Sequence, residues 1–92
     1  MLTRYYTKQF KKSSRRIIKS GIVSQLFLEN FVDQLATNKP LSKQHRDHQL
    51  TGTWTGYREC HLKPDLLLIY KIEGQALILV LADIGSHSQL FD

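Results

Sequence analysis

Imidazole and carboxylate side chains gather in the second half of this 92-residue chain, in a combination suited to acid–base chemistry. Histidine is the side chain whose ordinary pKa allows it to exchange a proton near pH 7. Two or more imidazoles beside a carboxylate therefore form a general acid–base site that needs no metal ion. The residues predicted to make up this site are His48, Glu59, His61, Asp65 and His87.

A strand predicted over residues 54–62 sorts some of these side chains onto two faces. Side chains alternate along a strand, so Glu59 and His61 lie on one face and Cys60 on the other. Cys60 suits the core, where a thiol is inert. Asp65 follows just after the Lys-Pro turn and is expected to come near His61. Glu59 and His61 are thus predicted to lie side by side on the open face of a sheet.

Loops bring the remaining histidines toward this face. Residues 38–52 form a polar loop, the longest irregular stretch, and such loops in small domains usually carry function or are disordered. His48 in this loop is expected to fold over the open face, whereas His45 is interpreted as a surface residue without a role. His87 follows the last predicted strand, and the ends of strands are where sites are built on a rigid sheet.

Each candidate has a simpler interpretation when it is taken singly. A lone strand histidine is most often a half-exposed surface residue, Asp65 suits a turn, and His87 after Gly-Ser suits a helix cap. It is the coincidence of several such residues near one sheet face that favours a functional site.

A metal site is the first alternative. His45 and His48 are three residues apart and His61 and Asp65 are four apart, spacings that suit zinc on a helix. Here these pairs fall on a loop and across a turn, and the chain has no Cys-x-x-Cys motif. It also lacks a glycine-rich phosphate loop or a nucleotide fingerprint. The sequence therefore predicts a site with neither metal nor cofactor.

RNA cleavage is the reaction that fits imidazoles and carboxylates beside a basic surface. RNA carries its own nucleophile, the 2′-hydroxyl group. A base withdraws its proton, an acid protonates the leaving 5′-oxygen, and a cation stabilises the charge that builds on the phosphate. Arg58 and Lys63 are the nearby candidates for this cation, and Phe91 or Trp54 is a candidate for stacking on a base.

The positive charge of the chain is concentrated at its beginning. The formal net charge is +5, and no acidic residue precedes Glu29. Such an uneven distribution favours an anionic partner, nucleic acid or an acidic protein, over a helix that is merely solvated, because a solvated helix usually mixes both signs. The residues predicted to bind RNA in this region are Lys8, Lys11, Lys12, Arg15 and Arg16.

Hydrophobic periodicity predicts an α+β fold with the element order β-α-α-β-β-β and a short C-terminal helix. Two N-terminal helices are expected to cover one face of a twisted, mainly antiparallel four-stranded sheet, because the turns between the last three strands are short. The last two strands are apolar on both faces, so their second face must be covered, form a concave site or bind a partner. The predicted strands are 1–6, 54–62, 66–72 and 76–84, and the predicted helices are 8–20 and 24–37.

Length and composition indicate one domain, residues 1–92, with a single modest core. No apolar run approaches the roughly 20 residues of a membrane-spanning helix, so no membrane association is expected. The basic first residues are not followed by the apolar stretch of a signal peptide. A single cysteine fits a reducing compartment, and we expect a cytoplasmic protein.

Several motifs together resemble those of YafQ-type mRNA interferase toxins of the RelE/ParE superfamily. The resemblance runs over nearly the whole chain and is strongest from residue 47 onward. Its motifs are Asp47-His48-Gln49-Leu50, then Gly52-x-Trp54-x-Gly56-Tyr57-Arg58-Glu59-x-His61, then Lys63-Pro64-Asp65-Leu66-Leu67-Leu68-Ile69-Tyr70, and finally Gly85-Ser86-His87-x-x-Leu90-Phe91.

This resemblance implies a RelE-like fold and a bacterial toxin that cuts messenger RNA on the translating ribosome. It also implies a cognate DinJ-like antitoxin that blocks the toxin, in a heterotetramer of the two proteins. The basic first helix would contact ribosomal RNA. The motifs assign catalytic roles to His48, Glu59, His61, Asp65 and His87, and they place the family's terminal aromatic residue at Phe91.

One position departs from the family pattern. Relatives carry an arginine two residues before the Gly-[Ser/Thr]-His motif, where this chain has Asp83. A carboxylate repels phosphate, so the cation must come from Arg58, a lysine or the ribosome, or else the protein is slow. Two alternatives share the scaffold: a non-enzymatic ParE-like toxin that acts on DNA gyrase, and a simple RNA-binding module. Neither needs the acid–base cluster, so that cluster favours the nuclease.

Overall fold

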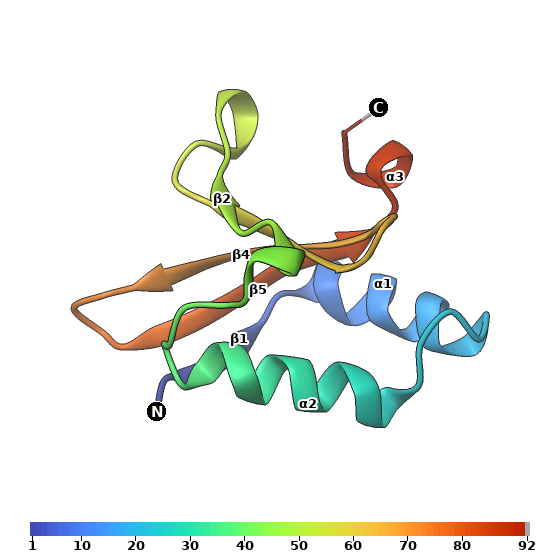
Figure 1. The fold of residues 1–92 in the computed structure, drawn as a ribbon, viewed down its shortest axis with the longest axis horizontal. Helices are drawn as coiled ribbons and strands as arrows, with labels where there is room; N and C mark the ends of the chain where they lie inside the picture. Colours follow the sequence, from blue (N-terminus) through green and yellow to red (C-terminus); the bar gives the residue numbers. More distant parts are fainter. Residues whose placement is uncertain (92) are drawn as a thin grey trace.

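A sheet of five strands runs through the middle of the molecule and separates two long helices from one short helix (Figure 1). The computed structural model describes residues 1–91. The strands stand in the order β1-β5-β4-β3-β2; β1 is parallel to β5, and every other neighbouring pair is antiparallel. Their bounds are β1 (Thr3–Tyr6), β2 (His48–Gln49), β3 (Arg58–Lys63), β4 (Leu66–Glu73) and β5 (Ile78–Gly85).

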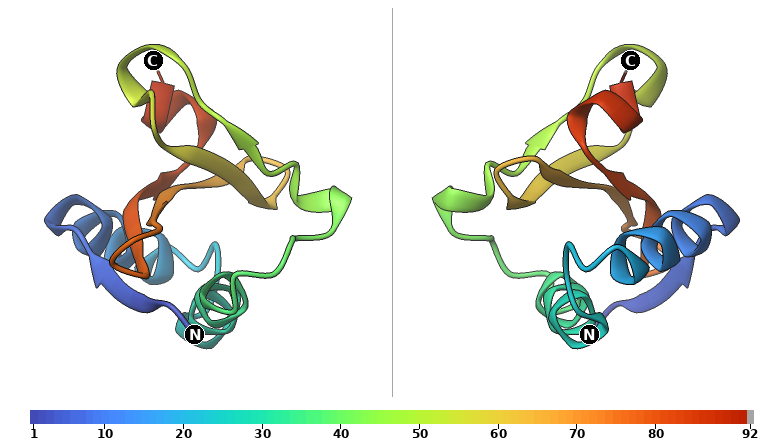
Figure 2. Two further views of the ribbon diagram at one scale, coloured as in Figure 1. Left: turned by 90° about the vertical axis from the view of Figure 1, so that its left-hand side faces the viewer. Right: turned by 90° about the vertical axis from the view of Figure 1, so that its right-hand side faces the viewer.

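Helices α1 (Lys8–Lys19) and α2 (Gln25–Ala36) cover one face of the sheet, which we call the helix face. The other face, the open face, carries α3 (His87–Phe91) and the chain that connects β2 to β3 (Figures 1 and 2). The α+β class, the helical hairpin and the C-terminal helix agree with the sequence-based prediction. No helix in residues 1–91 is long and apolar enough to cross a membrane.

The core lies between the helix face and the two long helices. Leu68, Leu79, Leu81 and Ile84 are completely buried in it. Burial of each such side chain contributes about 1.5–3 kcal/mol to folding.

The opposite face of the central strands is also buried, because Leu67 and Ile69 are 1% and 0% exposed. The second apolar face of these strands is therefore not exposed to solvent or free for a partner, because other parts of the chain cover it.

The strand count is where the fold prediction was wrong. The predicted loop over residues 38–52 contains a fifth strand, β2, together with a 3₁₀ turn at Lys43–His45. β2 is two polar residues long, too short to show the alternation that identifies a strand. The next strand begins at Arg58 rather than at residue 54, because Gly52–Trp54 forms a second 3₁₀ turn.

Local capping explains why the two long helices begin where they do. The Ser24 hydroxyl oxygen accepts a hydrogen bond of 3.0 Å from the Phe27 amide at the start of α2. The Thr7 oxygen accepts one of 3.0 Å from the Phe10 amide at the start of α1, and the same hydroxyl donates to the Ala82 carbonyl oxygen of β5 at 2.8 Å. Thr7 thus fixes the first turn of α1 and ties this helix to the sheet.

Replacement of Thr7 by alanine is expected to lower the free energy of unfolding by about 1–2 kcal/mol, because the cap and the bond to β5 are lost together. Urea denaturation of the native chain and the variant measures this difference. Thr7→Ser keeps the hydroxyl group and should retain most of the stability. Equal losses in the alanine and serine variants would show that the methyl group, not the hydroxyl, is responsible.

Candidate active site

The pairing of β2 with β3 places a buried carboxylate between two imidazole rings. His48 lies directly opposite Glu59 in the sheet, and His61 follows Glu59 on the same face of β3. The Glu59 Oε1 atom is 3.2 Å from His61 Nε2 and 3.8 Å from His48 Nε2. Only 7% of the Glu59 side chain is exposed. Two of the predicted site residues, His48 and His61, therefore both approach a third, Glu59.

Backbone carbonyls fix the orientation of the histidine at position 48. Its Nδ1 atom is 2.7 Å from the Arg46 carbonyl oxygen. A carbonyl oxygen only accepts hydrogen bonds, so Nδ1 is the donor and carries the hydrogen. In the neutral ring the lone pair is then on Nε2, which is the atom able to take up a proton. A carboxylate beside an imidazole holds its orientation and balances the charge that it gains on protonation.

His45 has a structural role that the sequence did not suggest. Its Nδ1 atom lies 2.8 Å from the His61 carbonyl oxygen, and its ring meets Phe31 edge-on with the centroids 5.1 Å apart. The interpretation of His45 as a surface residue without a role was therefore wrong, because this ring joins the 3₁₀ turn to both α2 and β3.

A second carboxylate holds the segment that carries His48. Asp47 points toward the helix face, where its two oxygens accept hydrogen bonds from Arg58 at 3.2 and 3.3 Å. The Tyr70 hydroxyl donates to the same carboxylate at 2.6 Å. The hydrogen bond with Asp47 raises the pKa of the Arg58 guanidinium above its ordinary value. Burial, followed by the bond to Asp47, raises the pKa of the Tyr70 phenol.

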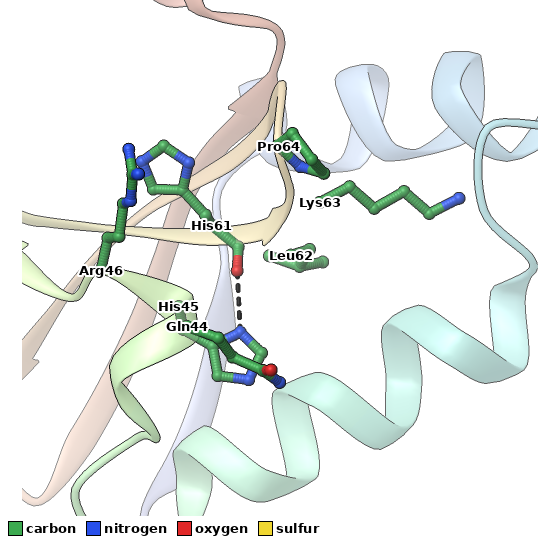
Figure 3. Close-up of a pocket in the computed structure, with 7 residues that line it drawn as sticks. All are labelled: Gln44, His45, Arg46, His61, Leu62, Lys63 and Pro64. Atoms are coloured by element: carbon green, nitrogen blue, oxygen red, sulfur yellow. Dashed lines mark hydrogen bonds between the residues drawn. The ribbon is translucent and has the colours of Figure 1, made fainter.

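The two cations expected beside the histidines lie elsewhere, so this expectation was wrong. Arg58 alternates with Glu59 along β3 and faces the opposite side of the sheet, where Asp47 holds it. The Lys63 ammonium group donates to the Ile22 carbonyl oxygen at 2.6 Å, and Figure 3 shows this side chain pointing away from the His61 ring. Arg58 is therefore on the other side of the sheet, and Lys63, although it lines the same cavity as His61, has its ammonium group bound to the Ile22 carbonyl oxygen.

Arg46 is a residue of this region that the sequence did not single out. Arg46 and His61 line one cavity of about 440 Å³ (Figure 3). The turn before Arg46 is held against β3 by the hydrogen bond from His45 Nδ1 to the His61 carbonyl oxygen. The sequence could not reveal this neighbourhood, because it depends on contacts between distant segments.

His87 and Asp65 meet at the start of α3. The His87 amide donates to Asp65 Oδ1 at 3.0 Å, so this carboxylate of the β3–β4 turn anchors the helix. Ser86 and Gln89 cap α3 reciprocally, since the Ser86 amide donates to Gln89 Oε1 at 2.8 Å and the Gln89 amide donates to Ser86 Oγ at 3.2 Å. Asp65 thus positions His87. The predicted contact between Asp65 and His61 is not found among residues 1–91.

A glycine allows α3 to lie close to β5. A side chain at Gly85 would place its Cβ atom 2.8 Å from Gln89 Oε1 and 3.3 Å from Gln89 Cβ, so the Gln89 side chain that caps α3 would have to shift. The exposed His87 is carried by this short helix on the open-face side, and its ring is 5.2 Å from the ring of Phe91.

The aromatic and basic residues predicted to bind RNA are divided between the two sides of the sheet. Phe91 is half-buried on α3, and Trp54 packs edge-on against Tyr57 with centroids 5.3 Å apart. The basic residues of α1 are all exposed but lie on the helix side (Figure 1). The sequence suggested that this helix lays RNA directly across His48 and His61. Its position on the helix side does not allow that. The residues concerned are Lys8, Lys11, Lys12, Arg15 and Arg16.

Cys60 is completely buried on the helix face, as predicted. Burial, with smaller contributions from Asp47 and Glu59, raises the pKa of this thiol far above its ordinary value. It is therefore no nucleophile. Among residues 1–91 no group of three or more His, Cys, Asp or Glu side chains is arranged to hold a metal ion.

Comparison with known proteins gives one consistent family. The family model described as "Bacterial toxin of type II toxin-antitoxin system, YafQ" matches residues 2–92. A relative from Escherichia coli K12 named "mRNA interferase toxin YafQ" is 42% identical over 52 residues, which are 56% of this chain and 54% of the relative. The match thus spans about half the length of that relative.

Two solved structures resemble this one over essentially the whole chain. A metal-bound toxin from Helicobacter pylori is 45% identical with a TM-score of 0.90, covering 99% of this chain and 100% of that one. The toxin in an E. coli DinJ-YafQ complex is 30% identical with a TM-score of 0.83, covering 100% of both chains.

Removal of the charge at Asp47 is expected to destabilise the protein by about 1–3 kcal/mol, since Arg58 would lose its charged partner. Asp47→Asn tests this by urea denaturation, and Tyr70→Phe should cost about 0.5–1.5 kcal/mol because it removes one hydrogen bond. Asp33 pairs with Arg4 but is 60% exposed, so Asp33→Asn is the matched control with an effect below about 1 kcal/mol. Equal effects of the two Asp→Asn variants would contradict a special role for Asp47.

Proposed function

We propose that this chain, which belongs to the YafQ family of toxins from bacterial type II toxin–antitoxin systems, is an endoribonuclease that cleaves messenger RNA. The observation that carries the proposal is the Glu59 carboxylate, held between the imidazole rings of His48 and His61. Such a group moves protons and needs no redox partner. The name of the E. coli relative, an mRNA interferase toxin, supports the same activity.

The proposed reaction uses the 2′-hydroxyl group of RNA as the nucleophile. His48 is the base, because its Nδ1 hydrogen is engaged with the Arg46 carbonyl and Nε2 is able to accept the proton. The new 2′-O–P bond forms as the P–O5′ bond breaks, leaving a 2′,3′-cyclic phosphate. His61 or His87 supplies the proton that the leaving 5′-oxygen takes up. Glu59 balances the imidazolium charges, and Asp65 positions His87 through its backbone amide.

Cleavage is proposed to take place on the translating ribosome. Helix α1, whose basic side chains are exposed, lies on the side of the sheet opposite α3 (Figure 2). A partner that meets both sides must be large, and ribosomal RNA is a large anionic surface. Contacts between α1 and ribosomal RNA would hold the toxin, while messenger RNA enters the open face and Phe91 stacks on a base. The site of action is then the cytoplasm.

A DinJ-like antitoxin is the proposed protein partner. The related E. coli toxin has been solved in a DinJ-YafQ complex. In this chain the exposed cations of α1, with no acidic residue before Glu29, favour an acidic segment of such an antitoxin. We propose that toxin and antitoxin form a heterotetramer in which α1 is part of the contact surface.

Loss of any one of the three histidines proposed to transfer protons is expected to remove most of the cleavage of messenger RNA. His48→Ala, His61→Ala and His87→Ala should each lower the rate of messenger RNA cleavage on purified ribosomes by about 10²–10⁴-fold. Glu59→Gln should act in the same direction, because the neutral amide no longer balances an imidazolium. The same variants are expected to relieve growth arrest when expression is induced.

Lys39→Ala, an exposed residue away from the site, is the control and should behave as the native chain. Growth arrest as strong as that of the parent in both His61→Ala and His87→Ala would overturn the nuclease assignment in favour of a non-enzymatic toxin or an RNA-binding module. Cleavage should also persist in EDTA, and complete inhibition by EDTA would point to a metal-dependent reaction instead.

Charge reversal on α1 is expected to weaken antitoxin binding. The triple variant Lys8→Glu, Lys12→Glu, Arg16→Glu replaces three exposed cations of one helix and should raise the dissociation constant of the complex by at least about tenfold. Titration calorimetry with a DinJ-like antitoxin at two salt concentrations measures the effect. Unchanged affinity would refute the contribution of α1 to the contact surface.

A further inference from the structure

We infer that Arg46 is a catalytic residue, the cation that binds the scissile phosphate of RNA beside His61. This inference rests on the ribonuclease function proposed above. The sequence motifs give Arg46 no role, and the two cations expected there, Arg58 and Lys63, are held elsewhere.

The backbone fixes the position of Arg46 relative to both histidines. It ends the 3₁₀ turn Lys43–His45 in the left-handed conformation, with φ 47°. Its carbonyl oxygen accepts the hydrogen bond from His48 Nδ1 at 2.7 Å. The preceding residue, His45, donates from Nδ1 to the His61 carbonyl oxygen at 2.8 Å, which holds this turn against β3. Arg46 and His61 line the same cavity (Figure 3).

The side chain of Arg46 differs from the other cations near the sheet in having, within the described part of the chain, neither an ion-pair partner nor a hydrogen-bond acceptor. Arg58 is paired with Asp47, Lys71 is paired with Glu73, and the Lys63 ammonium group donates to a carbonyl oxygen. Within residues 1–91 the exposed Arg46 guanidinium forms neither an ion pair nor a side-chain hydrogen bond. A guanidinium group offers paired N–H donors that match two phosphate oxygens.

Two carboxylates on the open face would repel the phosphate of an RNA substrate unless a cation such as Arg46 is close by. Ile69 lies between Glu59 on one neighbouring strand and Asp83 on the other, so both carboxylates fall in one row across the sheet. A phosphodiester approaching two carboxylates is repelled unless a positive group faces it. The motif resemblance leads us to expect an arginine where this chain has Asp83. Arg46 lies toward the edge of the sheet that is farther from Asp83, directly before the edge strand β2.

The role assigned to Arg46 is electrostatic. Its N–H groups would donate to the non-bridging oxygens as negative charge builds on the phosphorus during attack by the 2′-oxygen. The proton transfers remain with the histidines, so Arg46 changes the rate without changing the products.

The test compares Arg46→Gln with Lys43→Gln, which removes the same charge from a neighbouring exposed position of the same turn. We expect Arg46→Gln to lower cleavage on ribosomes by about 10²–10³-fold. Arg46→Lys should be intermediate, because an ammonium group lacks the planar pair of donors. Lys43→Gln should stay within about threefold of the native rate, since it lies outside the catalytic contacts. Thermal melting monitors folding in every variant.

Chemical rescue distinguishes catalysis from a structural role. Guanidinium ion at millimolar concentration should restore part of the activity of Arg46→Gln and none of the activity of His61→Ala. The double variant Arg46→Gln, Asp83→Arg should also regain activity, because it returns a guanidinium to the position that relatives use.

The outcomes separate this inference from the function on which it rests. Native-like cleavage by Arg46→Gln, with His61→Ala inactive, would overturn the role of Arg46 and leave the ribonuclease intact. Loss of activity accompanied by a lower melting temperature and no rescue by guanidinium would also overturn it, in favour of a purely positioning role for the Arg46 backbone. A native chain that cleaves no messenger RNA would refute the ribonuclease itself.

Discussion

The geometry of the candidate site depends on one carboxylate that is not part of it. Asp47 is fixed on the helix face by Arg58 and by the Tyr70 hydroxyl at 2.6 Å. Neighbouring side chains of an extended segment alternate, so His48 is directed to the opposite face. The two-residue strand β2 alone supplies too little pairing to hold this segment. A charged hydrogen-bond cluster beneath the sheet therefore positions the groups above it, and the cluster can be strong because Tyr70 is 3% exposed.

The two faces of the sheet have different tasks. The helix face buries the core and places the cations of α1 on the outer side of the molecule, whereas the open face carries the imidazoles and α3. Because α1 packs on the helix face, both the sheet and this helix lie between the basic surface and the site. In the proposed function the basic helix is therefore a docking surface separate from the site, for a larger particle or for an antitoxin.

Local rules predicted much of this fold, and long-range pairing decided the rest. Helices α1 and α2 were placed within one residue at either end, because Thr7, Ser24 and Gly21 are strong capping signals. Strand β2 was missed, because its two polar residues have meaning only opposite Glu59 and Arg58. His45 was misjudged for the same reason, since its partner is a carbonyl of β3.

The site residues show the same division. Alternation along β3 correctly put Glu59 and His61 on one face, and this alternation also placed Arg58 on the other. The prediction that Arg58 binds the phosphate was therefore inconsistent with the alternation of side chains that identified the site.

Asp83, which stands where the motif resemblance leads us to expect an arginine, illustrates how position and function can separate. Asp83 stands where the pairing of β4 and β5 shifts by one residue, and its Oδ1 atom accepts a hydrogen bond from the Ile84 amide at 2.8 Å. A short acidic side chain satisfies the backbone at such a bulge, which a long guanidinium stem pointing to the open face would not do. The positive charge that a phosphate requires must then come from another element. A segment anchored by Asp47, whose Arg46 lines the same cavity as His61, can supply it, because phosphate binding depends on where a guanidinium is held and not on which strand carries it.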